Sequence, residues 1–137
     1  FDYDVEFSMK SKSLAYVVDK LNTFGNTLQI LCNDTNITFK TSDVDGELKC
    51  ILYDSKDDSE YVDEFSCVED IDLNVSYGIK MFVNFCSFEK VNNIVYLSFS
   101  NNKPMKLSYK LDDYENEDLS VFKSELNFFL APKIDVD

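Results

Sequence analysis

Stretches that alternate apolar and polar residues occur in the same order twice along this chain. Residues 3–9 (Tyr-Asp-Val-Glu-Phe-Ser-Met) alternate, and residues 71–77 (Ile-Asp-Leu-Asn-Val-Ser-Tyr) do so again 68 positions later. Such alternation predicts a half-buried β-strand. Each run is followed by apolar residues at i, i+3, i+4 and i+7, the spacing of an amphipathic helix. These residues are Leu14, Val17, Val18 and Leu21 in the first segment, and Ile79, Phe82, Val83 and Cys86 in the second.

Each predicted helix is followed by segments that suit a β-hairpin and then by one further strand. Polar stretches at 33–36 and 101–104 separate pairs of apolar runs, as turns between antiparallel strands do. A run at 61–68 predicts one more strand after the acidic loop 54–60. The remaining expected strands are 27–32, 37–41 and 47–53 in the first half, and 94–99, 105–111 and 125–130 in the second.

This order predicts an α+β fold in which two β-α-β-β-β units pack two helices on antiparallel sheets. A chain of 137 residues is long enough for one such domain with a buried core. We expect a single domain over 1–137, with an internal repeat at about 1–67 and 68–134. Because Phe1 is not an initiator methionine, we also expect the chain to be part of a longer protein.

The residue types available for chemistry argue against an enzyme. The chain has no histidine, the commonest general base and the commonest transition-metal ligand. Four cysteines, at 32, 50, 67 and 86, form no CxxC pair, so they predict neither a zinc site nor a thioredoxin motif. We expect buried free thiols in a reducing compartment, with a two-disulfide secreted domain as the alternative.

No other pattern indicates a catalytic, metal or membrane site. The acidic run 43–47 lacks the full spacing of a calcium loop and predicts a turn between strands instead. No run has the length and apolar character of a membrane span. We therefore predict no catalytic residue, no cofactor and no membrane partner.

Positive charge is concentrated on the two predicted helical segments, although the chain as a whole has a net charge of −13. Segments 10–24 and 78–90 hold five lysines against two acids, whereas the other 109 residues hold eight lysines against 24 acids. Without arginine, bidentate guanine contacts are not available. The lysines suit weak contacts with phosphates that do not depend on base sequence, and an ordinary solvated helix face is the alternative. The five are Lys10, Lys12, Lys20, Lys80 and Lys90.

The last apolar run of the chain leads to one of its two prolines. Residues 125–130 predict a strand with Phe128 and Leu130 on one side and Phe129 on the other. Pro132 cannot donate to a sheet ladder, so strand pairing should stop there. An exposed apolar tail in such an acidic protein suggests a docking surface.

The terminal residues Leu130-Ala131-Pro132-Lys133-Ile134 resemble the C-terminal signature of eukaryotic DNA sliding clamps, the proliferating cell nuclear antigen family. The resemblance extends over nearly the whole chain. Its supporting residues are Ser13-Leu14-Ala15, Gly25, Val83-Asn84-Phe85 and Pro104. It implies the sliding-clamp (processivity) fold, in which helices line the central hole of a ring and sheets lie outside. The chain is similar to the C-terminal domain of one subunit, so it would be half a subunit.

The resemblance also implies a function and a set of partners. It implies a nuclear DNA polymerase processivity factor for replication and repair, which tethers proteins to DNA without chemistry of its own. The full-length protein would form a homotrimer around double-stranded DNA with the help of a clamp loader, whereas this chain alone would be monomeric or weakly associating. The five lysines would face the DNA.

Two surfaces of this chain receive roles from the same resemblance. Partners such as DNA polymerase would insert a clamp-interacting peptide into an apolar pocket, and one strand would pair with the neighbouring subunit. The pocket residues would be Pro104, Phe129, Leu130, Ala131, Pro132, Lys133 and Ile134. The strand residues would be Glu47, Leu48, Lys49, Cys50, Ile51, Leu52 and Tyr53.

Two features depart from the family's usual pattern, and other functions stay open. Asp19, Thr23 and Ser87 stand where cations would be expected on the channel helices, and the acidic stretch 112–124 is longer than the usual connection. One alternative is a clamp-fold relative with another role, such as a checkpoint clamp or a viral transcription factor. The others are an acidic secreted β-rich interaction domain and an enzyme that uses paired carboxylates.

Overall fold

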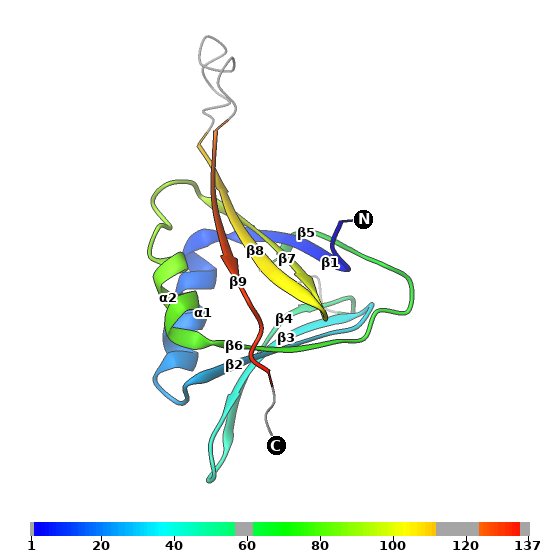
Figure 1. The fold of residues 1–137 in the computed structure, drawn as a ribbon, viewed down its shortest axis with the longest axis vertical. Coiled ribbons are helices and arrows are strands. Elements are labelled where there is room, and N and C mark those ends of the chain that lie inside the picture. Colours follow the sequence, from blue (N-terminus) through cyan, green and yellow to red (C-terminus); the bar gives the residue numbers. More distant parts are fainter. Residues whose placement is uncertain (1, 57–61, 112–123, 135–137) are drawn as a thin grey trace.

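The structure is a computed structural model that describes residues 2–56, 62–111 and 124–134. Two antiparallel sheets diverge from a pair of helices on one side of the molecule (Figure 1). The helices are α1 (Ser11–Asn22) and α2 (Ile79–Cys86). The strands are β1 (Val5–Lys10), β2 (Thr27–Cys32), β3 (Asn36–Ser42), β4 (Glu47–Asp54), β5 (Val62–Cys67), β6 (Leu73–Gly78), β7 (Ile94–Ser100), β8 (Lys103–Lys110) and β9 (Glu125–Leu130).

The order β-α-β-β-β occurs twice, as predicted, with β5 as an additional strand between the two units. The sheets, however, do not follow the two halves of the chain. Strand β1 lies in the five-stranded sheet β5-β1-β7-β8-β9, and β6 lies in the four-stranded sheet β4-β3-β2-β6. Each unit thus gives its first strand to the other unit's sheet, so the two units cannot separate without breaking two strand ladders. The predicted repeat boundary stays a prediction.

Aromatic side chains from both sheets and α2 meet in one core. Phe39 of β3 packs edge-on against Phe82 of α2, with ring centroids 6.0 Å apart. Phe99 of β7 lies 6.0 Å from both Phe7 of β1 and Tyr77 of β6. All five side chains are at most 3% exposed. Burial of such large apolar surfaces is the main stabilising contribution to the fold, and it joins elements that are distant in the sequence.

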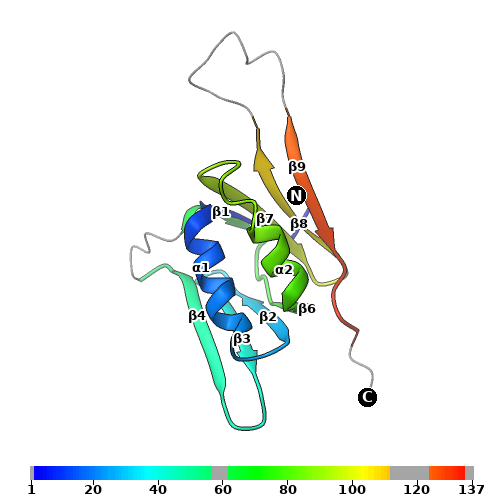
Figure 2. The same cartoon turned by 90° about the vertical axis from the view of Figure 1, so that its left-hand side faces the viewer.

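The two helices lie side by side and run in opposite directions (Figure 2). The backbone N–H of Ile79, at the start of α2, donates to the carbonyl of Asn26, just after α1, over 3.1 Å. At the other end, the N–H of Ser11 donates to the carbonyl of Asn93 over 2.8 Å.

Buried apolar residues of both helices face the core, as the 3.6-residue periodicity predicted. Val17 and Val83 are only half-buried, however, and Phe85 is buried although it was not part of the predicted stripe. No helix among the described residues is long and apolar enough to cross a membrane.

Several predicted boundaries were wrong. The first strand of each unit begins two residues later than predicted, at Val5 and Leu73. The helical segments 10–24 and 78–90 are shorter in the structure, because Thr23 and Ser87 end α1 and α2 and their hydroxyls donate to the carbonyls of Lys20 and Asn84. The turn expected at 101–104 is also shorter, since β8 begins at Lys103.

Pro104 therefore lies within β8, at a register shift of the β7–β8 ladder. Such irregular positions tolerate a residue without an N–H. Most of the acidic stretch 112–124 lies outside the described residues, as does Tyr61 of the strand predicted at 61–68.

Candidate docking surface and basic helix face

The final strand separates its two aromatic residues as the sequence predicted. Strand β9 pairs with β8, with Leu107 opposite Phe128 and Lys106 opposite Phe129. Phe128 packs on the core and stacks on Phe85 with ring centroids 4.6 Å apart, whereas Phe129 is 60% exposed. The sheet thus anchors the strand through one face and presents an aromatic ring to solvent on the other.

Beyond β9 the chain leaves the five-stranded sheet and contacts the four-stranded one. The backbone N–H of Lys133 donates to the carbonyl of Ser76 in β6 over 2.7 Å. Its ammonium group donates to the hydroxyl of Thr27 in β2 over 2.7 Å. Pairing in β9 ends at Leu130, before Pro132, as expected, but the attachment to β6 was not predicted. A backbone bond to a strand edge leaves no periodic signal in the sequence.

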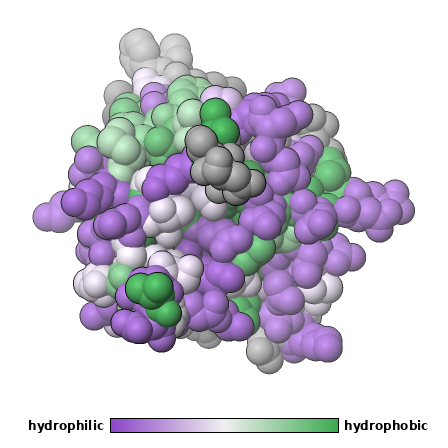
Figure 3. Space-filling model, turned by 60° about the horizontal axis from the view of Figure 1, so that its bottom comes forward, coloured by the Kyte–Doolittle hydropathy of each residue, from purple (hydrophilic) through white to green (hydrophobic). Residues whose placement is uncertain are grey.

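The structure brings most of the predicted docking residues to one region. Lys106 lies opposite Phe129 in the β8–β9 register, so these two side chains share the outer face of the sheet, and Pro104 is exposed two positions before Lys106. Ile134 is 85% exposed and Pro132 is half-buried, while Leu130 packs against the core rather than outward. On the face of the molecule that Figure 3 shows, hydrophilic residues cover most of the surface and hydrophobic residues gather in a few separate areas. An apolar group at the tail is therefore distinct from its surroundings.

All five predicted DNA-facing lysines are exposed, but only three lie on helices. Lys12 and Lys20 belong to α1 and Lys80 to α2, whereas Lys10 ends β1 and Lys90 follows α2. The predicted confinement of positive charge to helices was wrong in this detail, because both helices end earlier than their apolar periodicity suggested. Asp19 and Glu89 reduce the net positive charge of the two segments, and the Lys20 ammonium lies 5.2 Å from the centre of the Tyr16 ring.

A buried serine brings the lysines of the two segments together. The Ser11 hydroxyl is close to two carbonyls of the turn after α2, 3.0 Å from that of Glu89 and 2.6 Å from that of Asn92. Ser11 is flanked by Lys10 and Lys12, and the turn it holds contains Lys90. Three lysines therefore lie at one end of the helix pair. Sequence reasoning missed this contact, because a serine in an apolar–polar run does not reveal its partner.

Strand β4 is an edge of the four-stranded sheet and carries all seven residues predicted to meet another subunit. Leu52 is buried, and the Tyr53 ring stacks on Phe65 at 4.7 Å, so their side chains serve the core. Ile51 is 51% exposed and borders an apolar groove of about 410 Å³ between β4 and α1. Tyr16 and Val17 add to this groove and were not predicted.

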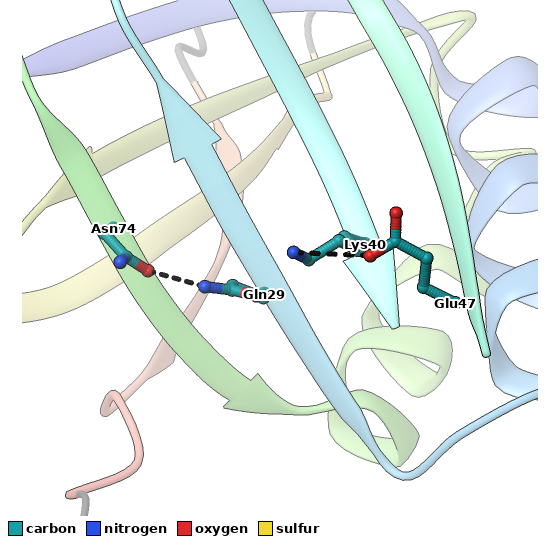
Figure 4. Close-up of polar contacts among 4 residues, drawn as sticks. All are labelled: Gln29, Lys40, Glu47 and Asn74. Atoms are coloured by element: carbon teal, nitrogen blue, oxygen red, sulfur yellow. Dashed lines mark hydrogen bonds and ion pairs between the residues drawn. The ribbon is translucent and has the colours of Figure 1, made fainter. Parts of the chain in front are cut away.

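Polar side chains occupy the outer face of the same sheet. Lys40 and Glu47 form an ion pair at 3.6 Å between β3 and β4, and the Gln29 amide donates to Asn74 over 2.9 Å between β2 and β6 (Figure 4). These contacts hold neighbouring strands in register at the surface. The apolar groove thus lies on the helix side of β4, away from this polar face.

The acidic run 43–47 forms the expected turn, whereas only two of the four cysteines are buried as expected. All four cysteines are free thiols, and burial raises the pKa of the Cys32 thiol to about 12. Cys32 and Cys86 are buried, whereas Cys50 and Cys67 are half-buried. The Asp43 carboxylate accepts the backbone N–H groups of Asp45 and Gly46, which makes the run a hairpin turn.

Comparison with known proteins identifies the fold and the family. The family model "Proliferating cell nuclear antigen, C-terminal domain" matches residues 1–132. Proliferating cell nuclear antigen 1 of Plasmodium falciparum (isolate 3D7) is 25% identical over 98% of this chain and 49% of its own length. The Caenorhabditis elegans proliferating cell nuclear antigen is 27% identical over 99% of this chain and 48% of its own length.

A solved structure agrees with these matches. The crystal structure of the Entamoeba histolytica proliferating cellular nuclear antigen superposes with a TM-score of 0.75 at 18% identity, over 98% of this chain and 47% of that one. The likeness shows the clamp-domain fold with two helices and two antiparallel sheets. The chain spans about half the length of the relatives it matches. It belongs to the proliferating cell nuclear antigen family and corresponds to the C-terminal domain of that family.

Proposed function

We propose that this chain is the partner-binding half of a sliding-clamp subunit, a processivity factor for DNA polymerase that acts in the nucleus. In the full-length protein, three subunits close around duplex DNA with the help of a clamp loader. The domain holds partner proteins at the DNA through its binding surfaces, and it supplies no catalytic group or cofactor of its own. The observation that supports this proposal most is the tail, where Phe129 is 60% exposed on a strand whose neighbouring side chains are anchored in the core.

The tail is suited to holding an apolar peptide. Pro104, Phe129 and Ile134 offer apolar surface, while the bonds of Lys133 to β6 and β2 fix the backbone beside them. A surface that is already ordered loses little conformational entropy on binding. An aromatic plug from a partner would bury Phe129 and gain most of the affinity there.

The five lysines would contact DNA phosphates, and the β4 edge would meet the next subunit. With few cations and no arginine, each contact is weak and independent of sequence, as movement along DNA requires. Ile51 and Tyr16, beside the apolar groove, would be covered by the neighbouring subunit. Replacing both Lys20 and Lys80 should reduce the salt dependence of duplex association in the assembled ring by about two counterions and leave peptide binding unchanged.

Binding of a labelled peptide with a clamp-interacting motif tests the docking role. We expect Phe129→Ala and Pro132→Ala each to weaken binding by about tenfold, in line with loss of a central apolar contact. Tyr16→Ala is the matched control, because Tyr16 is an equally exposed aromatic residue, at 65%, on the helix side of the molecule. Binding that is unchanged by both tail variants would refute the docking role.

A further inference from the structure

The outer face of the five-stranded sheet carries a polar hollow of about 520 Å³, to which all five strands contribute. We call it the outer hollow. Its lining includes Tyr96 and four serines, Ser8, Ser66, Ser98 and Ser108. The apolar residues on its border, such as Leu97, direct their side chains into the core and offer only backbone. The hollow therefore suits a polar ligand rather than an apolar one.

Most charges in the outer hollow are separated by sign. Strand register places Glu6 opposite Ser98 and Ser98 opposite Lys106, so these residues form one row across β1, β7 and β8. Glu64 lies farther along the same side, on β5, opposite Ser8. Carboxylates thus line the β5–β1 side, whereas the β8–β9 side carries Lys106 and Lys110 together with the carboxylate of Glu125. Two steps of about 4.8 Å between strands separate Glu6 from Lys106 by about 10 Å.

These charged groups are free to meet a ligand. Glu6, Glu64 and Lys106 make no ion pair with any described residue, unlike Lys40 on the other sheet. Lys110, by contrast, lies over the Tyr96 ring at 4.5 Å, and its register partner is Glu125. The charged groups of the hollow that make no ion pair with a described residue thus include one cation on β8 and two anions, on β1 and β5.

The outer hollow is continuous with the proposed docking surface. Lys106 lines the hollow and lies directly opposite Phe129 in the β8–β9 register. A peptide whose apolar anchor covers Phe129 can thus continue over Lys106 and cross the strands toward Glu6 and Glu64. Across the strands, Phe129 lies about 5 Å from Lys106, 14 Å from Glu6 and 19 Å from Glu64, or one, three and four strand spacings. An extended chain of about six residues, at 3.3 Å each, spans the longest of them.

We propose that the outer hollow binds the flank of the docked partner peptide and selects a particular order of charges in it. An acidic residue within the first two positions beyond the anchor meets Lys106. Basic residues at about the fourth to sixth positions meet Glu6 and Glu64. The inference rests on the proposed docking function, since the anchor at Phe129 positions the flank.

Fluorescence anisotropy with the 137-residue chain and labelled peptides tests the proposal. One peptide carries the clamp-interacting motif alone. Other peptides add a six-residue flank to one side of the motif or to the other. In the matched order, the flank has one aspartate near the motif and two lysines at its far end. In the reversed order, the two lysines are near the motif and the aspartate is at the far end. A solvent-exposed ion pair changes an affinity about two- to threefold, so three pairs predict about tenfold tighter binding of the matched order on one side. The difference should shrink at high salt.

Charge-reversal variants link that difference to the hollow. Glu6→Lys and Lys106→Glu should each reduce the preference for the matched flank, and the double variant should favour the reversed order. The matched controls Asp45→Lys and Lys56→Glu make the same charge changes at exposed positions outside the hollow and should leave the preference unchanged.

The outcomes distinguish this inference from the docking function. If the motif alone binds and the two flank orders bind equally on both sides, the role of the hollow is refuted while docking stands. If the motif alone does not bind, both proposals fail. A preference that survives in the Glu6→Lys, Lys106→Glu double variant would likewise overturn the assignment to the hollow.

Discussion

Gly25→Ala is expected to destabilise the fold, because residue 25 follows α1 at a point where the chain lies directly against β3. A Cβ atom at Gly25 would lie well under 3.0 Å from the Thr41 hydroxyl oxygen and 3.4 Å from the Ser42 carbonyl oxygen. Thr41 is 1% exposed, so its side chain has little space to move. The φ angle of Gly25 is not positive, and the cost is therefore steric.

The expected loss follows from two opposing contributions. Overpacking by one methyl group in a close-packed site costs about 1–3 kcal/mol. The lower entropy of the unfolded chain returns about 0.5 kcal/mol when alanine replaces glycine at an ordinary φ angle. The free energy of unfolding of Gly25→Ala should therefore fall by about 1–2 kcal/mol, measured by urea denaturation with an unchanged m-value.

Two further variants isolate the clash. Gly78→Ala is the matched control, since a Cβ atom there would have no neighbour within 4 Å, and its stability should stay within about 1 kcal/mol of the wild type. Thr41→Ala in the Gly25→Ala background removes the hydroxyl oxygen, which has no hydrogen-bond partner in the described structure, and should recover part of the loss. Equal stability of Gly25→Ala and Gly78→Ala would refute the reasoning.

Three other substitutions or conditions test individual contacts. Phe128→Ala should lower the free energy of unfolding by about 2–3 kcal/mol because the Phe128 ring packs on the core. Phe129→Ala should lower it by less than about 1 kcal/mol because the Phe129 ring is exposed. Equal losses in urea denaturation would contradict the assigned faces. Tyr109→Phe removes a buried hydrogen bond of 2.8 Å from the Tyr109 hydroxyl to the Phe85 carbonyl. It should lower the free energy of unfolding by about 1 kcal/mol in the same assay. An unchanged free energy of unfolding would show that this bond does not stabilise the fold. Because burial raises the pKa of Cys32 from 9.0 to about 12, the folded protein keeps a proton that the unfolded thiol loses, so stability should fall as pH rises from about 9 to 12. Cys32→Ala should make that decline shallower, and an identical pH slope in both proteins would count against the linkage.

Local patterns predicted the elements well, because the features they encode are local. The alternation at 125–130 was enough to assign Phe128 to the core and Phe129 to the surface, since successive side chains in a strand must point to opposite faces. The apolar spacing of Leu14, Val17, Val18 and Leu21 likewise identified the buried face of α1, although Val17 is only half-buried. These assignments depend only on neighbours in the sequence.

Long-range contacts were not predictable in the same way. Alternation over residues 3–9 predicts a strand, but not that β1 pairs with β7 across almost 90 residues of chain. The hydrogen bonds of Ser11 to the turn after α2 and of Lys133 to Ser76 also join distant segments. Their acceptors are backbone carbonyl groups, which every residue has, so the sequence does not mark them. The outer hollow depends on the register of five strands, so its separated charges become visible only in the folded molecule.

The proposal that the tail is a docking surface is tested most directly by NMR. A clamp-interacting peptide is titrated into the isotopically labelled chain, and backbone amide shifts are mapped onto the structure. We predict the largest shifts at 105–106 and 129–134, with little change along α1. Shifts concentrated on the helix face, or an absence of shifts around Phe129 at saturating peptide, would contradict the proposed docking surface.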